Sequence, residues 1–140
     1  MRCLSRSPNR YRADMKADYL SENVLIAILA VNGWTADRVY PLTEQFRAVG
    51  LLDFAAVSGL SIEDIAERLA RGGYSRGEYM NQLLATRVLS MATVLTATEL
   101  TRLKQCLVEG RTTDVSDTLR GIKGVGPVVL ETFWSLQHTD

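Results

Sequence analysis

A glycine-rich turn between two short apolar segments constrains the fold of this chain most strongly. The stretch reads TLRGIKGVGPVVLETFWSL over residues 118–136, with apolar residues at helical spacing in 115–122 and again in 127–136. Gly124 and Gly126 allow backbone angles that other residues resist. Pro127 suits the first turn of a helix because its fixed φ is already helical. The stretch therefore predicts a helix, a tight hairpin and a second helix.

The predicted hairpin presents unpaired backbone amides at the start of its second helix. The first amides of a helix have no partner within that helix, and the helix dipole favours an anion there. We expect the amides of Gly124, Gly126, Val128 and Val129 to point outward as an anion site, with Lys123 beside them. An ordinary turn between two helices, with glycine at the bend, is the alternative interpretation.

The rest of the chain also follows helical periodicity, and no stretch alternates for long with the period of two that marks a strand. Residues 23–31 are almost continuously apolar and predict a buried central helix. The glycine-rich turn at residues 72–77 precedes a long helix, whose inward face we assign to Tyr79, Leu83, Val88 and Met91. We therefore predict an all-α domain of about six to eight helices.

Side chains that cap helices mark where several of these helices begin. Thr35 precedes one segment, and Ser61 and Thr96 each open a capping box with an acidic residue three positions later. Asp114 or Ser116 is expected to cap the first helix of the hairpin. These signals divide the chain into separate short helices.

Composition favours one folded domain with an uneven charge distribution. The chain has 140 residues, of which 46% are hydrophobic, and this is enough for a single core. The formal net charge is zero, whereas strong nucleic-acid binders are usually basic. Residues 1–16 carry five basic side chains against Asp14 alone, which leaves +4 on this segment and −4 on the rest. We expect a basic arm at 1–18, which either lies along phosphates or is simply solvated, and a helical domain at 19–137.

The cysteine content and the lack of a long apolar run indicate the setting of the protein. Cys3 and Cys106 are too few for a disulfide framework or for the four thiolates of a typical iron–sulfur cluster. No apolar run approaches the about 20 residues of a membrane span. His138 has no Cys or carboxylate pair at metal-ligand spacing, so no metal site is expected. We expect a soluble intracellular protein of the cytoplasm or the nucleoid.

In their order along the chain, these segments resemble the helix-hairpin-helix DNA glycosylases related to endonuclease III. Three short motifs carry the resemblance over roughly residues 20–136, and their order makes it specific. They are Thr35-Ala36-Asp37-Arg38-Val39 after the first helix, Gly73-Tyr74-Ser75-Arg76 before the long helix, and Ile122-Lys123-Gly124-Val125-Gly126 at the hairpin. The resemblance implies the six-helix half of such an enzyme, with a hairpin that grips a DNA backbone phosphate without reading the sequence. It also allows a monovalent cation at the hairpin.

The resemblance also identifies catalytic groups that this sequence lacks. Bifunctional members carry a catalytic lysine two residues after the second hairpin glycine, where this chain has Val128. A valine can neither attack a sugar carbon nor form a Schiff base. Members that act on alkylated bases also lack the lysine and often read Gly-x-Gly-Pro, as here. The essential aspartate of the family follows the second hairpin helix, and Asp140 is too close to the hairpin to take that position, so we expect no catalysis by this chain alone.

Three functions stay open on the sequence. The first is non-catalytic, sequence-independent binding of duplex DNA through its phosphates. The second is part of a DNA glycosylase, whose aspartate and second half come from a partner or from a second copy of the chain. The third is a protein-interaction module, which the zero net charge favours. Under the first, the expected DNA contacts are Arg76, Arg120, Lys123, Gly124, Val125, Gly126 and Val128.

Two further expectations concern side chains near these contacts. Trp34 lies beside a glycine at a helix end and is a candidate for stacking on a flipped base, with packing in the core as the alternative. Lys123 adjoins the hairpin glycines, and Arg120 lies three residues earlier on the same helical face. We therefore expect a small positive patch at the tip of the hairpin.

Overall fold

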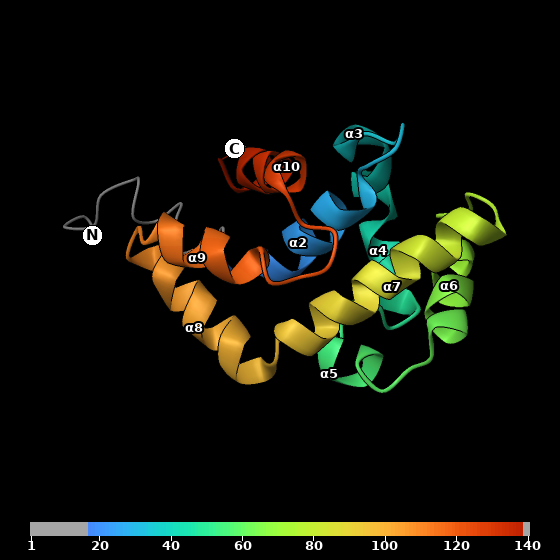
Figure 1. Ribbon diagram of the computed structural model, residues 1–140, viewed down its shortest axis with the longest axis horizontal. Helices are drawn as coiled ribbons and strands as arrows, with labels where there is room; N and C mark the ends of the chain where they lie inside the picture. The colour runs from blue at the N-terminus through green and yellow to red at the C-terminus, as the bar shows by residue number, and fades with distance from the viewer. Residues whose placement is uncertain (1–16, 139–140) are drawn as a thin grey trace.

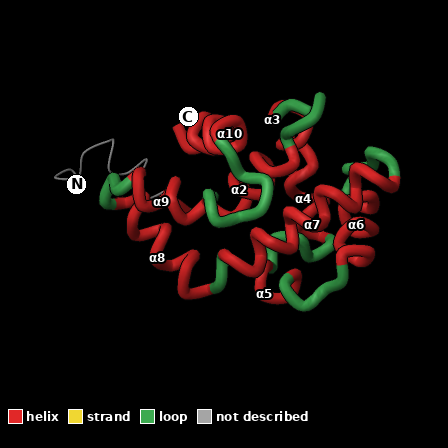
Figure 2. Tube along the Cα trace, viewed as in Figure 1, coloured by secondary structure: helices red, strands yellow, loops and turns green. Residues whose placement is uncertain are grey.

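The computed structural model describes residues 17–138, and all regular secondary structure in that range is helical (Figures 1 and 2). The helices in chain order are α2 (Leu20–Leu29), α3 (Ala36–Val39), the 3-10 helix η1 (Tyr40–Leu42), α4 (Thr43–Ala48), α5 (Phe54–Val57), α6 (Ile62–Arg71), α7 (Glu78–Val94), α8 (Ala97–Val108), α9 (Thr112–Leu119) and α10 (Pro127–His138). The all-α class predicted from the sequence is confirmed. The expectations for the basic arm and for Asp140 concern residues 1–16 and 139–140, which lie outside the described range.

Helix α2 is the buried central helix that the apolar run predicts (Figure 1). It packs against α3, α7, α8 and α10, which bury eight of its ten residues. A polar side chain inside such a core has to find a hydrogen-bond partner. Asn23 on α2 is buried, and its Nδ2 donates a 2.6 Å hydrogen bond to Oε1 of Gln137 on α10. This buried contact ties the last turn of α10 to the centre of the domain.

The glycine-rich turn between α6 and α7 brings Tyr74 into the core. Gly73 has a φ of +99°, and a Cβ there would lie 2.9 Å from Cδ2 of Leu42, so glycine is required at this position. The Tyr74 side chain is fully buried, and its hydroxyl donates a 2.7 Å hydrogen bond to the carbonyl of Leu29 at the end of α2. Burial raises the pKa of the Tyr74 phenol above its usual value, although a hydrogen bond from Arg76 opposes the shift. The turn therefore holds α7 against the C-terminal end of α2.

The inward face of α7 differs from the predicted one. Val88 and Met91 are buried as expected, but Tyr79 is 79% exposed and Leu83 is only half-buried. Leu83 and Val88 are five residues apart and therefore do not lie on the same face of a helix. Residues on one continuous face are three or four positions apart. The observed face follows such steps through Asn81, Leu84, Val88 and Met91.

Replacing Tyr79 should test this corrected register. Because the Tyr79 side chain is largely exposed, Tyr79→Ser should change the free energy of unfolding by less than about 0.5 kcal/mol. Urea denaturation followed by circular dichroism measures the change. A loss of about 2 kcal/mol or more would restore the original assignment of Tyr79 to the core.

Both predicted capping boxes are confirmed at their N-caps. Ser61 Oγ accepts a 3.1 Å hydrogen bond from the amide of Asp64, and Thr96 Oγ1 accepts a 3.2 Å hydrogen bond from the amide of Glu99. Thr35 occupies the N-cap position of α3, but its side chain makes no capping hydrogen bond. Helices α6 and α8 therefore begin where the sequence places them.

The predicted cap of the first hairpin helix is wrong. Helix α9 already begins at Thr112, with Arg111 at the N-cap position, so Asp114 and Ser116 lie inside the helix. The carboxylate of Asp114 accepts a 2.8 Å hydrogen bond from Nε of Arg111, and Ser116 Oγ accepts a 2.9 Å hydrogen bond from Nε1 of Trp134 on α10. Both side chains therefore bond to other side chains and do not cap the helix.

Candidate nucleic-acid interface at the helical hairpin

A turn of seven residues, 120–126, joins α9 to α10, where the sequence predicts a hairpin (Figure 1). The amide of Val125 donates a 3.1 Å hydrogen bond to the carbonyl of Ile122, whose side chain is buried, so the turn is anchored in the core. Gly124 has a φ of +87°, in the left-handed region that favours glycine. Pro127 is the first residue of α10, and the amide of Leu130 donates to the carbonyl of Gly126 at 3.0 Å. Backbone hydrogen bonds therefore fix the turn and the first residues of α10.

The amides expected to form an anion site make no hydrogen bond to any other residue in the range 17–138. They belong to Gly124, Gly126, Val128 and Val129. The neighbouring amide of Lys123 differs, because it donates a 2.8 Å hydrogen bond to Oγ of Ser90 on α7. Free amides at a helix N-terminus, next to an exposed lysine, have the donors and the dipole that hold an anion.

Helix α7 supports the hairpin from outside the motif. Besides Ser90, which holds the Lys123 amide, the half-buried Arg87 lies against Gly124. A Cβ built on Gly124 would lie 2.5 Å from both Cδ and Nε of Arg87. The sequence does not point to either residue, because the hydrogen bond to the hairpin spans 33 positions of the chain. The only sequence signal is that Arg87 and Ser90 lie three residues apart and so share one helical face.

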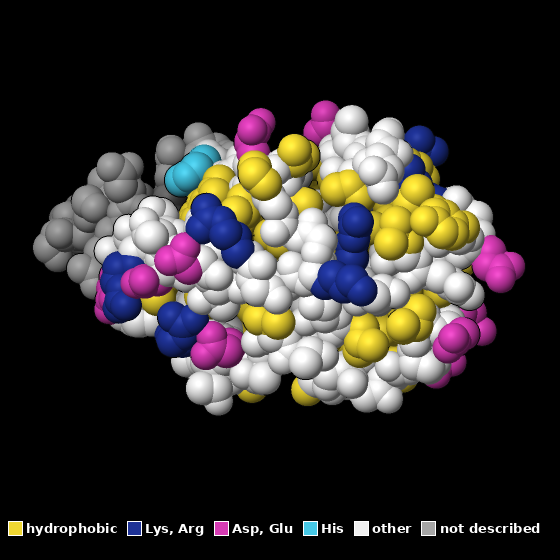
Figure 3. Space-filling view, in the orientation of Figure 1, with side chains coloured by type: hydrophobic (Ala, Val, Ile, Leu, Met, Phe, Trp, Pro, Cys, Tyr) yellow, Lys and Arg dark blue, Asp and Glu magenta, His cyan; other side chains and the backbone are white. Residues whose placement is uncertain are grey.

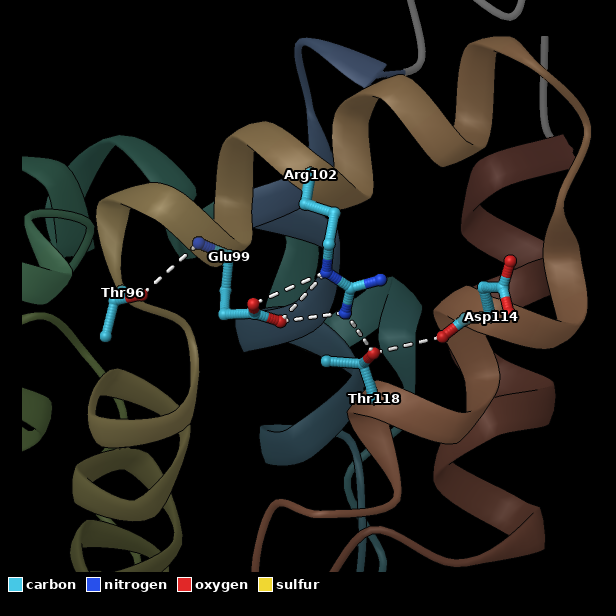
Figure 4. Close-up of polar contacts among 5 residues, drawn as sticks. All are labelled: Thr96, Glu99, Arg102, Asp114 and Thr118. Carbon is cyan, nitrogen blue, oxygen red and sulfur yellow. Dashed lines mark hydrogen bonds and ion pairs between the residues drawn. The ribbon is translucent and has the colours of Figure 1, made fainter.

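A side-chain network joins the first hairpin helix to α8. Figure 4 shows Arg102 of α8 between Glu99 and Thr118, with Nη2 donating at 2.8 Å to Glu99 Oε1 and at 2.6 Å to Thr118 Oγ1. The Thr118 hydroxyl in turn donates a 3.0 Å hydrogen bond to the carbonyl of Asp114 in the same helix. The network fixes α9 relative to α8, and it thereby helps to position the hairpin that follows α9.

Thr118→Val should measure how much this network contributes. Losing the hydrogen bond from Arg102 should lower the free energy of unfolding by about 1 kcal/mol. Thr101→Val is the matched control, because the Thr101 hydroxyl makes the same 3.0 Å bond to the carbonyl four residues earlier in its helix but receives none from an arginine. The two variants are compared by urea denaturation. Equal losses would mean that the bond from Arg102 contributes nothing measurable.

The three cations predicted to contact DNA do not gather at one place. Lys123 is exposed beside the hairpin glycines and makes no ion pair within the described residues. Arg120 is paired with Asp117, with 2.8 Å between Nη1 and Oδ1, so its charge is largely offset. Arg76 lies just before α7, and Ser90, which holds the hairpin, lies twelve residues after the first residue of that helix, or about 18 Å along it. Of the three, Lys123 is the one that adjoins the free amides.

Arg76 is engaged at the C-terminal end of α2. Its Nη1 donates a 2.7 Å hydrogen bond to the carbonyl of Val31 and a 3.0 Å hydrogen bond to the Tyr74 hydroxyl, and its Nη2 donates to the carbonyl of Asn32. A cation suits this place, since the last carbonyls of a helix lack partners and carry partial negative charge. These contacts give Arg76 a structural role in the fold.

Trp34 is half-buried among residues of the α2–α3 loop and the glycine-rich turn. Its ring centroid lies 4.7 Å from that of Tyr74, and the guanidinium of Arg38 lies 3.8 Å above its ring. The packing alternative therefore describes the position of Trp34 here, because a base could stack on this ring face only after Arg38 had moved.

Charge is unevenly spread over the face that carries the hairpin. Figure 3 shows Lys and Arg side chains over α9 and the middle of α7, and Asp and Glu side chains beside those over α9 and at the edge over α6. A cleft of about 280 Å³ between α6 and the start of α7 is lined by three carboxylates, from Glu63, Glu67 and Glu78. Phosphate would be repelled at that cleft, which leaves the hairpin as the better place for an anion.

Val128, where the resemblance would place a catalytic lysine, carries no reactive group. Val128 lies in the first turn of α10, and its side chain is 71% exposed.

Among residues 17–138, no group of three or more His, Cys, Asp or Glu side chains is placed to hold a metal ion. In the same range, no single helix is both long and apolar enough to cross a membrane, and α7 with α8 reaches that length and composition only as a pair bent by 81°. The site therefore offers backbone amides and cations.

Comparison of the chain with protein-family models, with curated proteins and with solved structures found no significant match.

Proposed function

We propose that this chain binds duplex DNA without regard to sequence, by holding a backbone phosphate at the hairpin. The observation that carries the proposal is the set of free amides of Gly124, Gly126, Val128 and Val129 at the N-terminus of α10, next to the exposed Lys123. Such amides, together with the helix dipole, bind phosphate oxygens. Phosphate contacts position a protein on DNA but carry no sequence information directly.

The chemistry of the hairpin further supports binding without catalysis. Val128 has neither an amine nor a carboxylate, so it cannot act on a sugar or a base. The formal net charge of zero gives little long-range attraction, and few cations adjoin the hairpin. Each phosphate neutralised contributes about 0.9 to the slope of log affinity against log salt, so we expect weak binding with a slope of about 1 to 2.

Titrating two fluorescent duplexes of unrelated sequence, with anisotropy as the readout, tests the proposal. Both should bind with equal affinity at low salt, and both affinities should fall at physiological ionic strength, about 0.15 M. The proposal is overturned if neither duplex binds at low salt. It is also overturned if one duplex binds far more tightly than the other, because a phosphate site cannot distinguish them.

A protein-interaction module is the second candidate, and the exposure of Val128 favours it. An apolar side chain that is 71% exposed at the tip of a hairpin is not needed for phosphate binding, but it is suited to contact with another protein surface. Light scattering over a range of concentrations would show whether the chain associates with itself. Self-association together with no DNA binding at low salt would favour this second function.

A further inference from the structure

Neither of the two arginines predicted to contact DNA is well placed to assist the free amides of the hairpin. Arg76 donates to carbonyls at the end of α2, and Arg120 is paired with Asp117. Of these three cations only Lys123 adjoins the glycines, and a lysine is a flexible point charge without the planar fork that matches a phosphate. Arg87 of α7, by contrast, is an arginine that lies against Gly124.

Arg87 combines two properties that bear on the hairpin. Within residues 17–138 it makes no hydrogen bond and no ion pair, so its donors are uncommitted there. Its side chain also packs on the hairpin itself, since Cδ and Nε lie 2.5 Å from the position that a Gly124 Cβ would take. Nε is therefore about 4 Å or less from the Gly124 Cα, one bond length further away. The guanidinium of Arg87 includes this Nε atom, so it lies next to Gly124, whose amide is one of the free amides.

We propose that Arg87 is the cation that completes the phosphate site of the hairpin. This inference rests on the proposed function. The guanidinium can donate two parallel hydrogen bonds to phosphate oxygens, while the amides of Gly124 and Gly126 donate from the hairpin. Because the stem of Arg87 is already packed against Gly124, little side-chain freedom is lost on binding. Because Gly124 has no Cβ, it also leaves room for the side chain of Arg87.

Three variants of the full chain test this assignment by duplex anisotropy over a range of salt. Arg87→Met keeps an apolar stem and removes the charge, so DNA affinity at low salt should fall about tenfold and the salt slope should fall by about 1. Arg87→Lys should keep the slope of the parent, because the charge is kept. Arg71→Met is the matched control, since Arg71 is exposed on α6 and, within residues 17–138, pairs only with Glu67. It should behave as the parent.

The outcomes separate this inference from the proposed function. If the parent binds DNA and Arg87→Met has the same affinity and slope, the assignment of Arg87 is wrong and the proposed function stands. If the parent does not bind DNA at low salt, both are wrong. Thermal unfolding shows whether Arg87→Met is folded at the temperature of the titration. Arg87→Gln, with a polar head group on a similar stem, carries the same prediction for the slope should the methionine variant be unfolded.

Discussion

Gly124→Glu should reduce the affinity for duplex DNA at low salt by about tenfold or more, since it places a carboxylate where a phosphate is expected to bind. Two further effects act in the same direction. Gly124 has a φ of +87°, which costs a residue with a Cβ about 1–2 kcal/mol. The new Cβ would also lie 2.5 Å from Cδ and Nε of Arg87, so the arginine has to leave the hairpin. Fluorescence anisotropy of a labelled duplex measures the loss.

Gly110→Glu is the matched control for this variant. Gly110 is an exposed turn glycine with a φ of +75°, between α8 and α9, and a Cβ there would meet no atom within 4 Å. The control introduces the same carboxylate, the same change in net charge and a similar backbone strain away from the hairpin glycines. It should keep the affinity of the parent. If both variants bind DNA as well as the parent at low salt, the hairpin is not the binding site.

Arg76→Ala should lower the free energy of unfolding by about 2–3 kcal/mol, the range expected when hydrogen bonds from a charged group to partly buried acceptors are lost. The Arg76 side chain donates to the carbonyls of Val31 and Asn32 and to the Tyr74 hydroxyl. Removing it leaves the C-terminal carbonyls of α2 without these donors, and it also removes a cation 5.4 Å from the Trp34 ring centroid. Urea denaturation of parent and variant measures the change.

Arg71→Ala provides the reference for a surface arginine. The Arg71 side chain is 57% exposed, and its ion pair with Glu67 has a separation of 3.5 Å, so its loss should cost less than about 0.5 kcal/mol. The salt slope of DNA binding, measured on folded Arg76→Ala, should match that of the parent, because Arg76 lies away from the hairpin. A reduced slope with unchanged stability would instead support the original assignment of Arg76 as a phosphate contact.

The parts of the fold that were predicted correctly have local causes. Ser61 and Thr96 cap helices through amides only three residues away, and Pro127 begins α10 through its own fixed φ. The hairpin likewise depends on Gly124, whose positive φ is a property of that residue. Such signals act within one turn of helix, so they can be read from the sequence alone.

The contacts of Arg76 and Arg87 join distant segments of the chain. The carbonyls that engage Arg76 lie 44 and 45 positions away in the chain, and Arg87 meets Gly124 only after α7 and the hairpin have packed. The miss at Asp114 has a local cause. Its residue type is typical of an N-cap, but its carboxylate accepts a hydrogen bond from Arg111, three residues earlier, and the helix already begins at Thr112. A single sequence does not reveal which of these side chains will be engaged in hydrogen bonds or packing within the folded chain.

The hydrogen bond between Asn23 and Gln137 makes the candidate binding surface depend on a contact between the two ends of the described chain. It joins residues 114 positions apart, so the contact forms only after most of the chain has been brought together. Helix α10 has twelve residues, close to the length below which isolated helices are marginal in water, and it therefore relies on α2 for its stability. The free amides at its N-terminus thus depend on the packing of α10 against α2, and a peptide containing the hairpin alone would lack the scaffold that shapes them.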